Sequence, residues 1–358
     1  MMIKEEAISL LKSLIGTPSL SREEDRTARL IKEYFESKNI KVHGTGNNVW
    51  VRNKGFAPSK PTLLLNSHHD TVKPNQRYTK DPFTAQVEDG KLYGLGSNDA
   101  GGALVSLIIT FLHYYEQEEL PFNLVFAGTA EEEISGRDGI ESILPQLGKV
   151  DLAIVGEPTL MQLAVAEKGL MVLDCIAHGK AGHAARDEGE NALYKAMKDI
   201  HWFRAYQFEK VSDALGKVKM NVTQISAGSQ HNVVPDECHF VVDVRVTDAY
   251  TLEDTLEIIR NQVNCEVKPR SVRLQPSGIA PNHPIISVAD KLGIQKFGSP
   301  TLSDQALMPF PSVKIGPGDS ARSHTADEYI YLKEIGEGIE GYIRILKGLT
   351  MELGSWKP

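Results

Sequence analysis

Three consecutive glutamates, Glu131, Glu132 and Glu133, are the part of the sequence whose residue types most directly suggest chemistry. They follow residues 124–127, a short apolar run that predicts a buried strand, so the carboxylates stand where that strand ends. Side chains that are adjacent in an extended segment point in opposite directions, which allows Glu132 and Glu133 different roles. Like charges side by side repel one another unless cations or solvent compensate them. An acidic triplet is also typical of a solvated loop, and the triplet alone leaves both interpretations open.

A histidine and an aspartate follow another apolar run, residues 62–65, which predicts a strand buried on both faces. His68 and Asp70 are two residues apart, so both side chains of an extended segment would face the same way. A metal-bound imidazole needs an acceptor on its second nitrogen, commonly a carboxylate, and Asp70 is a candidate for this role beside His68. The alternative is a polar turn with solvated histidines.

Three more candidates follow the same pattern. Asp99 precedes an apolar helix predicted over residues 103–115, where it is either a helix N-cap or a carboxylate that bridges two metal ions. Glu157 follows a further buried strand within Gly-Glu-Pro-Thr, which is also an ordinary turn sequence. His324 lies after a short strand predicted over residues 311–315.

These side chains make up one inventory of nitrogen and oxygen ligands at separate strand ends: His68, Asp99, Glu133, Glu157 and His324. The inventory suits two ions such as zinc, bridged by one carboxylate and one water. Dispersed residues can be selected to fit many sites, so their spacing makes the metal centre a hypothesis.

The elements that would position these residues predict two domains, which is also the expectation for a chain of 358 residues. Residues 1–168 and 276–358 alternate helices with apolar strands and predict an α/β domain. Residues 169–275 instead predict a β-α-β-β-α-β order, the ferredoxin-like arrangement, in an inserted second domain. Its long strands and helices are predicted at 170–177, 191–205, 217–225, 238–246, 252–262 and 265–274. Near the N-terminus, Ser21 and Glu24 predict a capping box at the start of the second helix.

Composition excludes several classes of function. The formal net charge of −8, without a basic run, argues against a nucleic-acid groove. No apolar run approaches the roughly 18 to 20 residues needed to span a bilayer, and the N-terminus has no apolar signal core, so we expect neither a membrane span nor a secretory signal. Cys175, Cys238 and Cys265 are widely spaced, which favours a reducing cytoplasm and argues against a disulfide framework or a cysteine zinc site.

The chain resembles the M20 metallopeptidase and deacylase family, in particular its acetylornithine deacetylase and succinyl-diaminopimelate desuccinylase group. The resemblance covers essentially the whole chain and rests on the order and spacing of these motifs: His68-x-Asp70, Gly96-x-x-Asp99, Glu131-Glu132-Glu133, Gly156-Glu157-Pro158-Thr159 and Gly318-Asp-Ser-Ala-Arg-Ser-His324. It implies a zinc-exopeptidase-like catalytic domain, with a mixed central sheet flanked by helices, and an inserted ferredoxin-like dimerisation domain.

The resemblance also implies roles for single residues. Two Zn²⁺ per chain, for which Co²⁺ can substitute, would share Asp99 as the bridging ligand. His68 and Glu157 would complete one metal site. Glu133 and His324 would complete the other. Asp70 would orient His68, and Glu132 would be the general base.

Three residues of the inserted domain carry implied roles as well. His183 would act in trans, reaching the active site of the partner subunit in a homodimer. Asn232 and Arg245 would help to bind the substrate carboxylate, a task that suits the fork of a guanidinium. An exposed loop histidine is the alternative for His183, and an ion pair with Asp243 is the alternative for Arg245.

The expected reaction is hydrolysis of the N-acyl amide of an amino acid. The motifs look most similar to those of acetylornithine deacetylases, which implies release of acetate from N-acetyl-L-ornithine in arginine biosynthesis. N-succinylornithine, N-acetylcitrulline, succinyl-diaminopimelate and small peptides are the competing substrates, and Ser303 and Asp304 are a guess for the side-chain pocket. A non-catalytic scaffold on the same fold is the alternative from another class, and the presence of every ligand and of Glu132 argues against it.

Overall fold

The computed structural model describes residues 2–353, and its chain divides into two compact units. The first consists of the residues up to Val165, of 278–297 and of those from Ser303 onward, and the second consists of 166–277 and 298–302. The predicted limits of the inserted domain, 169 and 275, lie close to those of the second unit. Residues 298–302 differ from the prediction, because they join the second unit and not the first.

The described residues contain these α-helices: α1 (Met2–Ile15), α2 (Asp25–Glu36), α3 (Gly102–Tyr115), α4 (Ile140–Leu147), α5 (Ala192–Ala205), α6 (Leu252–Arg260), α7 (Pro284–Leu292) and α8 (Leu332–Leu353). The strands are β1 (Val42–Thr45), β2 (Asn48–Arg52), β3 (Thr62–His68), β4 (Gln86–Glu88), β5 (Lys91–Tyr93), β6 (Asn123–Thr129), β7 (Leu152–Val155), β8 (Leu163–Glu167), β9 (Gly169–His178), β10 (Gly182–His183), β11 (Lys219–Ala227), β12 (Val233–Val234), β13 (Glu237–Val246), β14 (Glu266–Pro269), β15 (Ser277–Gly278), β16 (Lys296–Ser299), β17 (Ser312–Lys314) and β18 (Tyr329–Tyr331). None of these helices is long and apolar enough to cross a membrane.

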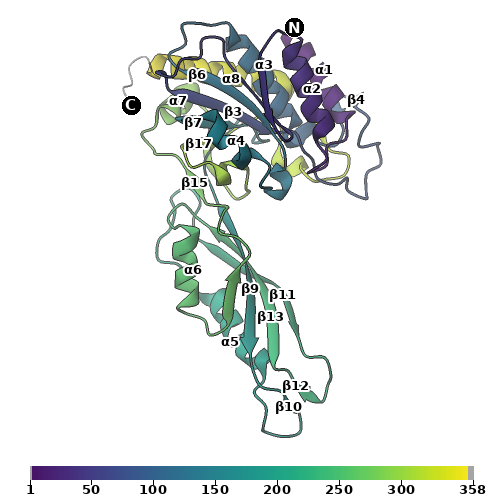
Figure 1. The fold of residues 1–358 in the computed structure, drawn as a ribbon, viewed down its shortest axis with the longest axis vertical. Helices are drawn as coiled ribbons and strands as arrows, with labels where there is room; N and C mark the ends of the chain where they lie inside the picture. The colour runs from purple at the N-terminus through teal and green to yellow at the C-terminus, as the bar shows by residue number, and fades with distance from the viewer. Residues whose placement is uncertain (1, 354–358) are drawn as a thin grey trace. The chain divides into compact units, whose positions relative to one another are not determined.

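A mixed sheet forms the centre of the first unit, as predicted, with the order β1-β2-β6-β3-β7-β17-β8 (Figure 1). β3 is parallel to both β6 and β7, and β17 is parallel to β7, whereas β2 is antiparallel to β6. Every residue of β3 is buried. Leu63 and Leu65 belong to the larger apolar core with α1, α3 and α8, while Leu64 belongs to a smaller core with α4, so the sheet is covered on both faces.

The parallel strands of this sheet deliver the candidate ligands to one edge. His68 is the last residue of β3 and is the register partner of Thr129, the last residue of β6. β7 pairs with β3 on its other side and ends at Val155, two residues before Glu157. Since the carboxyl ends of neighbouring parallel strands meet at the same edge, residues distant in sequence come together there.

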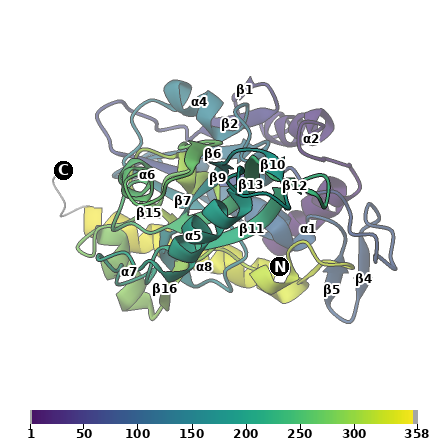
Figure 2. The same cartoon turned by 90° about the horizontal axis from the view of Figure 1, so that it is seen from below.

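The second unit contains an antiparallel sheet in the order β11-β13-β9-β14, whose central strands are labelled with α5 and α6 in Figures 1 and 2. Residues of α5 and α6 belong to the same apolar core as the strands. This is the predicted ferredoxin-like arrangement. A two-residue pairing of β10 with β12 is added to it, placing His183 opposite Val233. The strand predicted over 265–274 was too long, because β14 ends at Pro269, and proline has no N–H with which to continue a ladder.

Candidate metal centre

His68 is the most enclosed of the candidate ligands, with 1% of its surface exposed. Its Nε2 lies 3.4 Å from Oδ1 of Asp99, 3.8 Å from Oε1 of Glu157 and 3.9 Å from Oε2 of Glu132. Its Nδ1 lies 3.0 Å from the backbone oxygen of Asp70 and 3.4 Å from the Asp70 carboxylate. One ring nitrogen is therefore oriented by Asp70, and the other faces a group of carboxylates.

Asp99 stands between two histidines. Its Oδ1 faces His68, and its Oδ2 lies 3.6 Å from Nε2 of His324. The same nitrogen of His324 lies 2.9 Å from Oε2 of Glu133. Asp99 therefore has one oxygen near His68, which also lies beside Glu157, and the other near His324, which pairs with Glu133.

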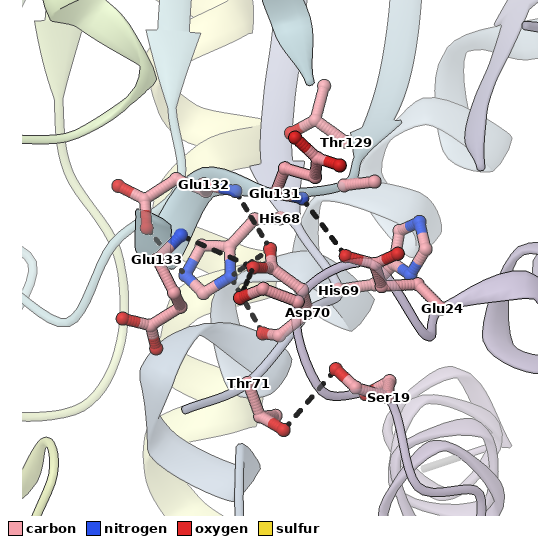
Figure 3. Close-up of polar contacts among 12 residues, drawn as sticks. Ser19, Glu24, His68, His69, Asp70, Thr71, Thr129, Glu131, Glu132 and Glu133 are labelled. Carbon is pink, nitrogen blue, oxygen red and sulfur yellow. Dashed lines mark hydrogen bonds and ion pairs between the residues drawn. The ribbon is translucent and has the colours of Figure 1, made fainter. Parts of the chain in front are cut away.

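The glutamate triplet forms a turn and not the extended segment on which the sequence argument relied. Glu131 has a left-handed backbone, with φ 55°, and residues Glu132–Ile134 form one turn of 3₁₀-helix. The backbone N–H of Glu131 donates to Glu24 at 3.2 Å, and those of Glu132 and Glu133 donate to the two oxygens of Asp70 at 3.1 and 3.2 Å (Figure 3). The turn, fixed by these bonds, sends Glu133 to His324 and Glu132 toward His68.

Electrostatics at this edge favour cations. Burial raises the pKa of Glu132 well above its ordinary value, against the opposite effect of His68, and it raises the pKa of Glu157 to about 8. Burial alone would lower the pKa of His68, but the surrounding carboxylates, Glu132 first, hold it well above its ordinary value. The hydrogen bond with Glu133 raises the pKa of His324 to about 9. Burial favours the protonated forms of the two glutamates, and the neighbouring carboxylates favour the protonated forms of the two histidines. Metal ions would supply the positive charge that this acidic edge otherwise takes from protons.

Two buried polar atoms at this site are not satisfied by hydrogen bonds from other protein groups in the described part of the chain. Within residues 2–353, neither Nε2 of His68 nor Oε1 of Glu157 has a hydrogen-bond partner. A buried polar atom without a partner costs free energy, so such an atom calls for an explanation. Ligand atoms of His68, Asp99 and Glu133, and separately of His68, Glu132 and Glu157, lie within 4.8 Å of one another. Imidazole nitrogen and carboxylate oxygen are donors that suit Zn²⁺, and the residues therefore fit a metal centre.

A family model for Peptidase family M20/M25/M40 matches residues 64–348. The chain belongs to this family. It is therefore a metal-dependent amidohydrolase of the peptidase and deacylase type, in agreement with the metal-ligand inventory at the edge of the sheet.

Several M20 relatives are similar along almost the whole chain. A succinyl-diaminopimelate desuccinylase of Corynebacterium glutamicum is 27% identical over 92% of this chain and 93% of its own length. An acetylornithine deacetylase of Proteus mirabilis is 27% identical over 90% of this chain and 91% of its own. The fold is similar to that of a dinuclear metal-binding M20 peptidase from Bacillus subtilis, with a TM-score of 0.76, 18% identity, and coverage of 98% and 99%.

Two buried acids that support the M20 centre, Glu24 and Glu328, were not predicted from the sequence. For Glu24, the sequence pattern was noticed but was interpreted as a capping box. The predicted capping box is wrong: Ser21 donates to Asp70 at 2.7 Å, and the Glu24 side chain accepts N–H bonds from Arg22 and Glu131. Glu24 precedes the helix as its N-cap residue but makes no side-chain cap bond. Ser21 and Glu24, which matched the capping-box pattern, instead make hydrogen bonds to Asp70 and Glu131, which are distant in sequence.

The second missed acid is Glu328, whose side chain accepts the backbone N–H groups of Gly96, Asn98 and Asp99. Burial, followed by the charge of Asp99, raises the pKa of Glu328 to about 8. Asp304 is also enclosed, with 3% exposure, and accepts a hydrogen bond from Thr129 at 2.6 Å. It is therefore a buried acid beneath the end of β6, which does not support the guess that it lines a substrate side-chain pocket.

The remaining predicted residues all belong to the second unit. His183 is exposed, and its Nδ1 accepts a hydrogen bond from Ala185 at 3.1 Å. Asn232 lies beside it, because its backbone oxygen accepts the N–H of Ala184. Arg245 lies near the C-terminal end of β13, where its Nε and a terminal nitrogen donate to both oxygens of Asp243 at 2.9 and 3.1 Å. The structure brings His183 and Asn232 together, and it shows the ion pair that was the alternative for Arg245.

Proposed function

We propose that this M20 hydrolase removes the acyl group from an N-acyl amino acid, and that N-acetyl-L-ornithine is its substrate in arginine biosynthesis. The main support for the proposed reaction is the position of Asp99, which has one oxygen toward His68 and the other toward His324. The reaction class follows from the family. The substrate is supported by the similarity to the Proteus mirabilis acetylornithine deacetylase.

The proposed cofactor is a pair of Zn²⁺ ions, for which Co²⁺ can substitute. Asp99 would bridge them, His68 and Glu157 would hold one, and Glu133 and His324 would hold the other. When bound, such ions lower the pKa of water and polarise the acyl carbonyl. The support in this chain is the buried Nε2 of His68 and the crowding of carboxylates around it.

Glu132 is proposed to move the proton. Its carboxylate would accept a proton from the attacking water and deliver it to the leaving amine. Glu132 also lies among the candidate ligand atoms of His68 and Glu157, so a ligand role has to be weighed against the base role. We assign the base role because Glu133, and not Glu132, pairs with the second histidine, His324.

A homodimer is proposed to form through the second unit, with His183 stabilising the oxyanion in the partner's site and Asn232 and Arg245 contacting the substrate carboxylate. β11 is one of the two edge strands of the four-stranded sheet, and edge strands offer unpaired backbone groups to a partner. Large apolar side chains are exposed on this unit, since Tyr194 is 66% exposed on α5 and Ile225 is 53% exposed on β11. We place the protein in the cytoplasm, because its described cysteines are free.

A second substrate requires a direct test. The similarity to the succinyl-diaminopimelate desuccinylase is as high as that to the acetylornithine deacetylase, 27% in both cases. Protein reconstituted with Zn²⁺ or Co²⁺ should be assayed with N-acetylornithine, N-succinylornithine, N-acetylcitrulline, succinyl-diaminopimelate and dipeptides. We expect the highest kcat/KM for N-acetylornithine. Hydrolysis of succinyl-diaminopimelate alone would contradict the substrate and retain the reaction class, whereas no hydrolysis of any of these amides would contradict the reaction.

A further inference from the structure

Glu328 is a buried carboxylate for which the proposed reaction has no use. It is 2% exposed and follows His324 by four residues. One of its oxygens accepts the N–H groups of Asn98 at 2.8 Å and Asp99 at 2.9 Å, and the other accepts the N–H of Gly96 at 3.1 Å. The two oxygens of this single side chain therefore hold the loop at three backbone positions.

Backbone pairing joins the same two segments. The N–H of Gly94 donates to the backbone oxygen of Glu328 at 3.0 Å, and β18 then pairs with β5, with Tyr329 opposite Tyr93. Glu328 therefore stands where the segment that carries His324 meets the loop that carries Asp99. Its side chain links two segments that are distant in the chain, since Asp99 and His324 are 225 residues apart.

The position of the Asp99 backbone decides where its two oxygens lie. They are 3.4 Å from His68 and 3.6 Å from His324, on opposite sides of one short side chain. An aspartate has few rotatable bonds, so a shift of its backbone removes at least one of the two contacts. A carboxylate that bridges two ions needs both contacts at once.

We infer that Glu328 is a positioning residue of the metal centre: its three backbone hydrogen bonds fix Asp99 so that each oxygen faces a different histidine. The inference rests on the proposed function, because it concerns the way in which two ions would share Asp99. Glu328 acts through Asp99 and not on the substrate. Partners of this kind around metal ligands change affinity or activity by about 10- to 100-fold when they are substituted.

The test is Glu328→Gln in the full-length protein. The amide has the shape of the carboxylate but one acceptor oxygen, and its NH₂ group would oppose the N–H groups of the loop. Chelator-treated protein is titrated with Co²⁺ by calorimetry and by visible absorption, which reports ligand geometry. We expect Co²⁺ to bind about 10- to 100-fold more weakly, with an altered spectrum. With the best amide substrate, kcat should fall while KM stays within about threefold of its normal value.

Asp327→Asn is the matched control. Asp327 is the neighbouring residue and also accepts backbone N–H groups, from Thr79 and Lys80, both at 2.9 Å, but that loop carries no candidate ligand. The substitution makes the same change from a carboxyl group to an amide and perturbs the same kind of backbone hydrogen bond. It should leave the affinity for Co²⁺ and the absorption spectrum unchanged.

The outcomes separate the inference from the proposed function. Wild-type affinity and spectrum in Glu328→Gln, or equal losses in Glu328→Gln and Asp327→Asn, would overturn the positioning role. If Glu328→Gln fails to fold, Glu328→Asp is used, which keeps the carboxyl group on a shorter side chain and should still weaken Co²⁺ binding. Normal binding by that variant would overturn the inference as well. A wild-type chain that binds no Co²⁺ would instead contradict the proposed function, and the positioning role with it.

Discussion

The candidate residues of the two units are held in very different ways. In the first unit, the turn at Glu131–Glu133 and the loop at Asp99 have their backbone N–H groups bound by the buried acids Glu24, Asp70 and Glu328. In the second unit, His183 lies on the two-residue strand β10, which pairs with β12, and Asn232 immediately precedes β12; both residues are exposed. The first design suits atoms that must keep fixed positions around ions. The second suits residues that meet a substrate or a partner subunit, and the following experiments test that division.

The largest effect is expected from removal of metal. A chelator should abolish hydrolysis, and added Zn²⁺ or Co²⁺ should restore it. The bound ions should also stabilise the first unit, by about 2.7 kcal/mol at a free metal concentration 100-fold above Kd. Activity assays and thermal unfolding with and without chelator check both results. Full activity in the metal-free protein would remove the basis for treating the first unit as a metal centre.

Glu132→Gln should come next, with a loss of roughly 10²–10⁴-fold in kcat, the range for removal of a general acid or base. Metal content should stay normal, because this substitution would leave the two ligand groups intact. Glu133→Gln is the paired variant and should lose metal affinity as well. Metal analysis and steady-state kinetics distinguish them, and equal metal loss in both would make Glu132 a ligand.

His183→Ala tests the role of the second unit. We expect kcat to fall by roughly 10²–10³-fold, as for the loss of one oxyanion donor, while metal content and the dimer remain. His239→Ala, at an exposed histidine of the same unit, should have normal kinetics. Kinetics, metal analysis and the mass in solution are the measurements. Metal loss in His183→Ala would contradict the assignment of metal binding to the first unit alone.

Arg245→Gln should have the smallest effect. The guanidinium has five N–H donors, and its bonds to Asp243 are made by Nε and one terminal nitrogen. If the remaining donors hold a substrate carboxylate, KM should rise about tenfold, equivalent to about 1.4 kcal/mol, with kcat unchanged. An unchanged KM would leave Arg245 with the structural role that its ion pair already shows.

Sequence patterns predicted the architecture of the first unit well because its central strands are buried on both faces. Such strands carry a continuous apolar run, so the polar residues that come after the run are conspicuous, as Asn66, Ser67 and His68 are after Leu65 in β3. The parallel order of the strands then brings their ends together. The separation of Glu132 from Glu133 was also expected, although the reason was wrong, because a turn and not an extended segment directs them apart.

The supporting acids could not be predicted in this way. Glu24 and Glu328 act on backbone N–H groups of loops that are distant in sequence, and a backbone group leaves no mark in the residue pattern. Ser21 and Glu24 even matched a local helix-start signal, which long-range contacts with Asp70 and Glu131 override. For Arg245, the sequence offered both a substrate and Asp243 as partners, and only coordinates could show the ion pair.

The distribution of the ligands along the chain has a consequence for biosynthesis. His68, Asp99, Glu133 and Glu157 precede the second unit, whereas His324 follows it. During synthesis from the N-terminus, the second unit is complete before the last ligand has been made, and domains generally fold as units as they emerge. Until the segment that carries His324 has been synthesised, the acidic edge of the first unit therefore lacks one of its candidate ligands. If His324 is the last ligand, as proposed, a complete metal centre can form only after the C-terminal segment has been made.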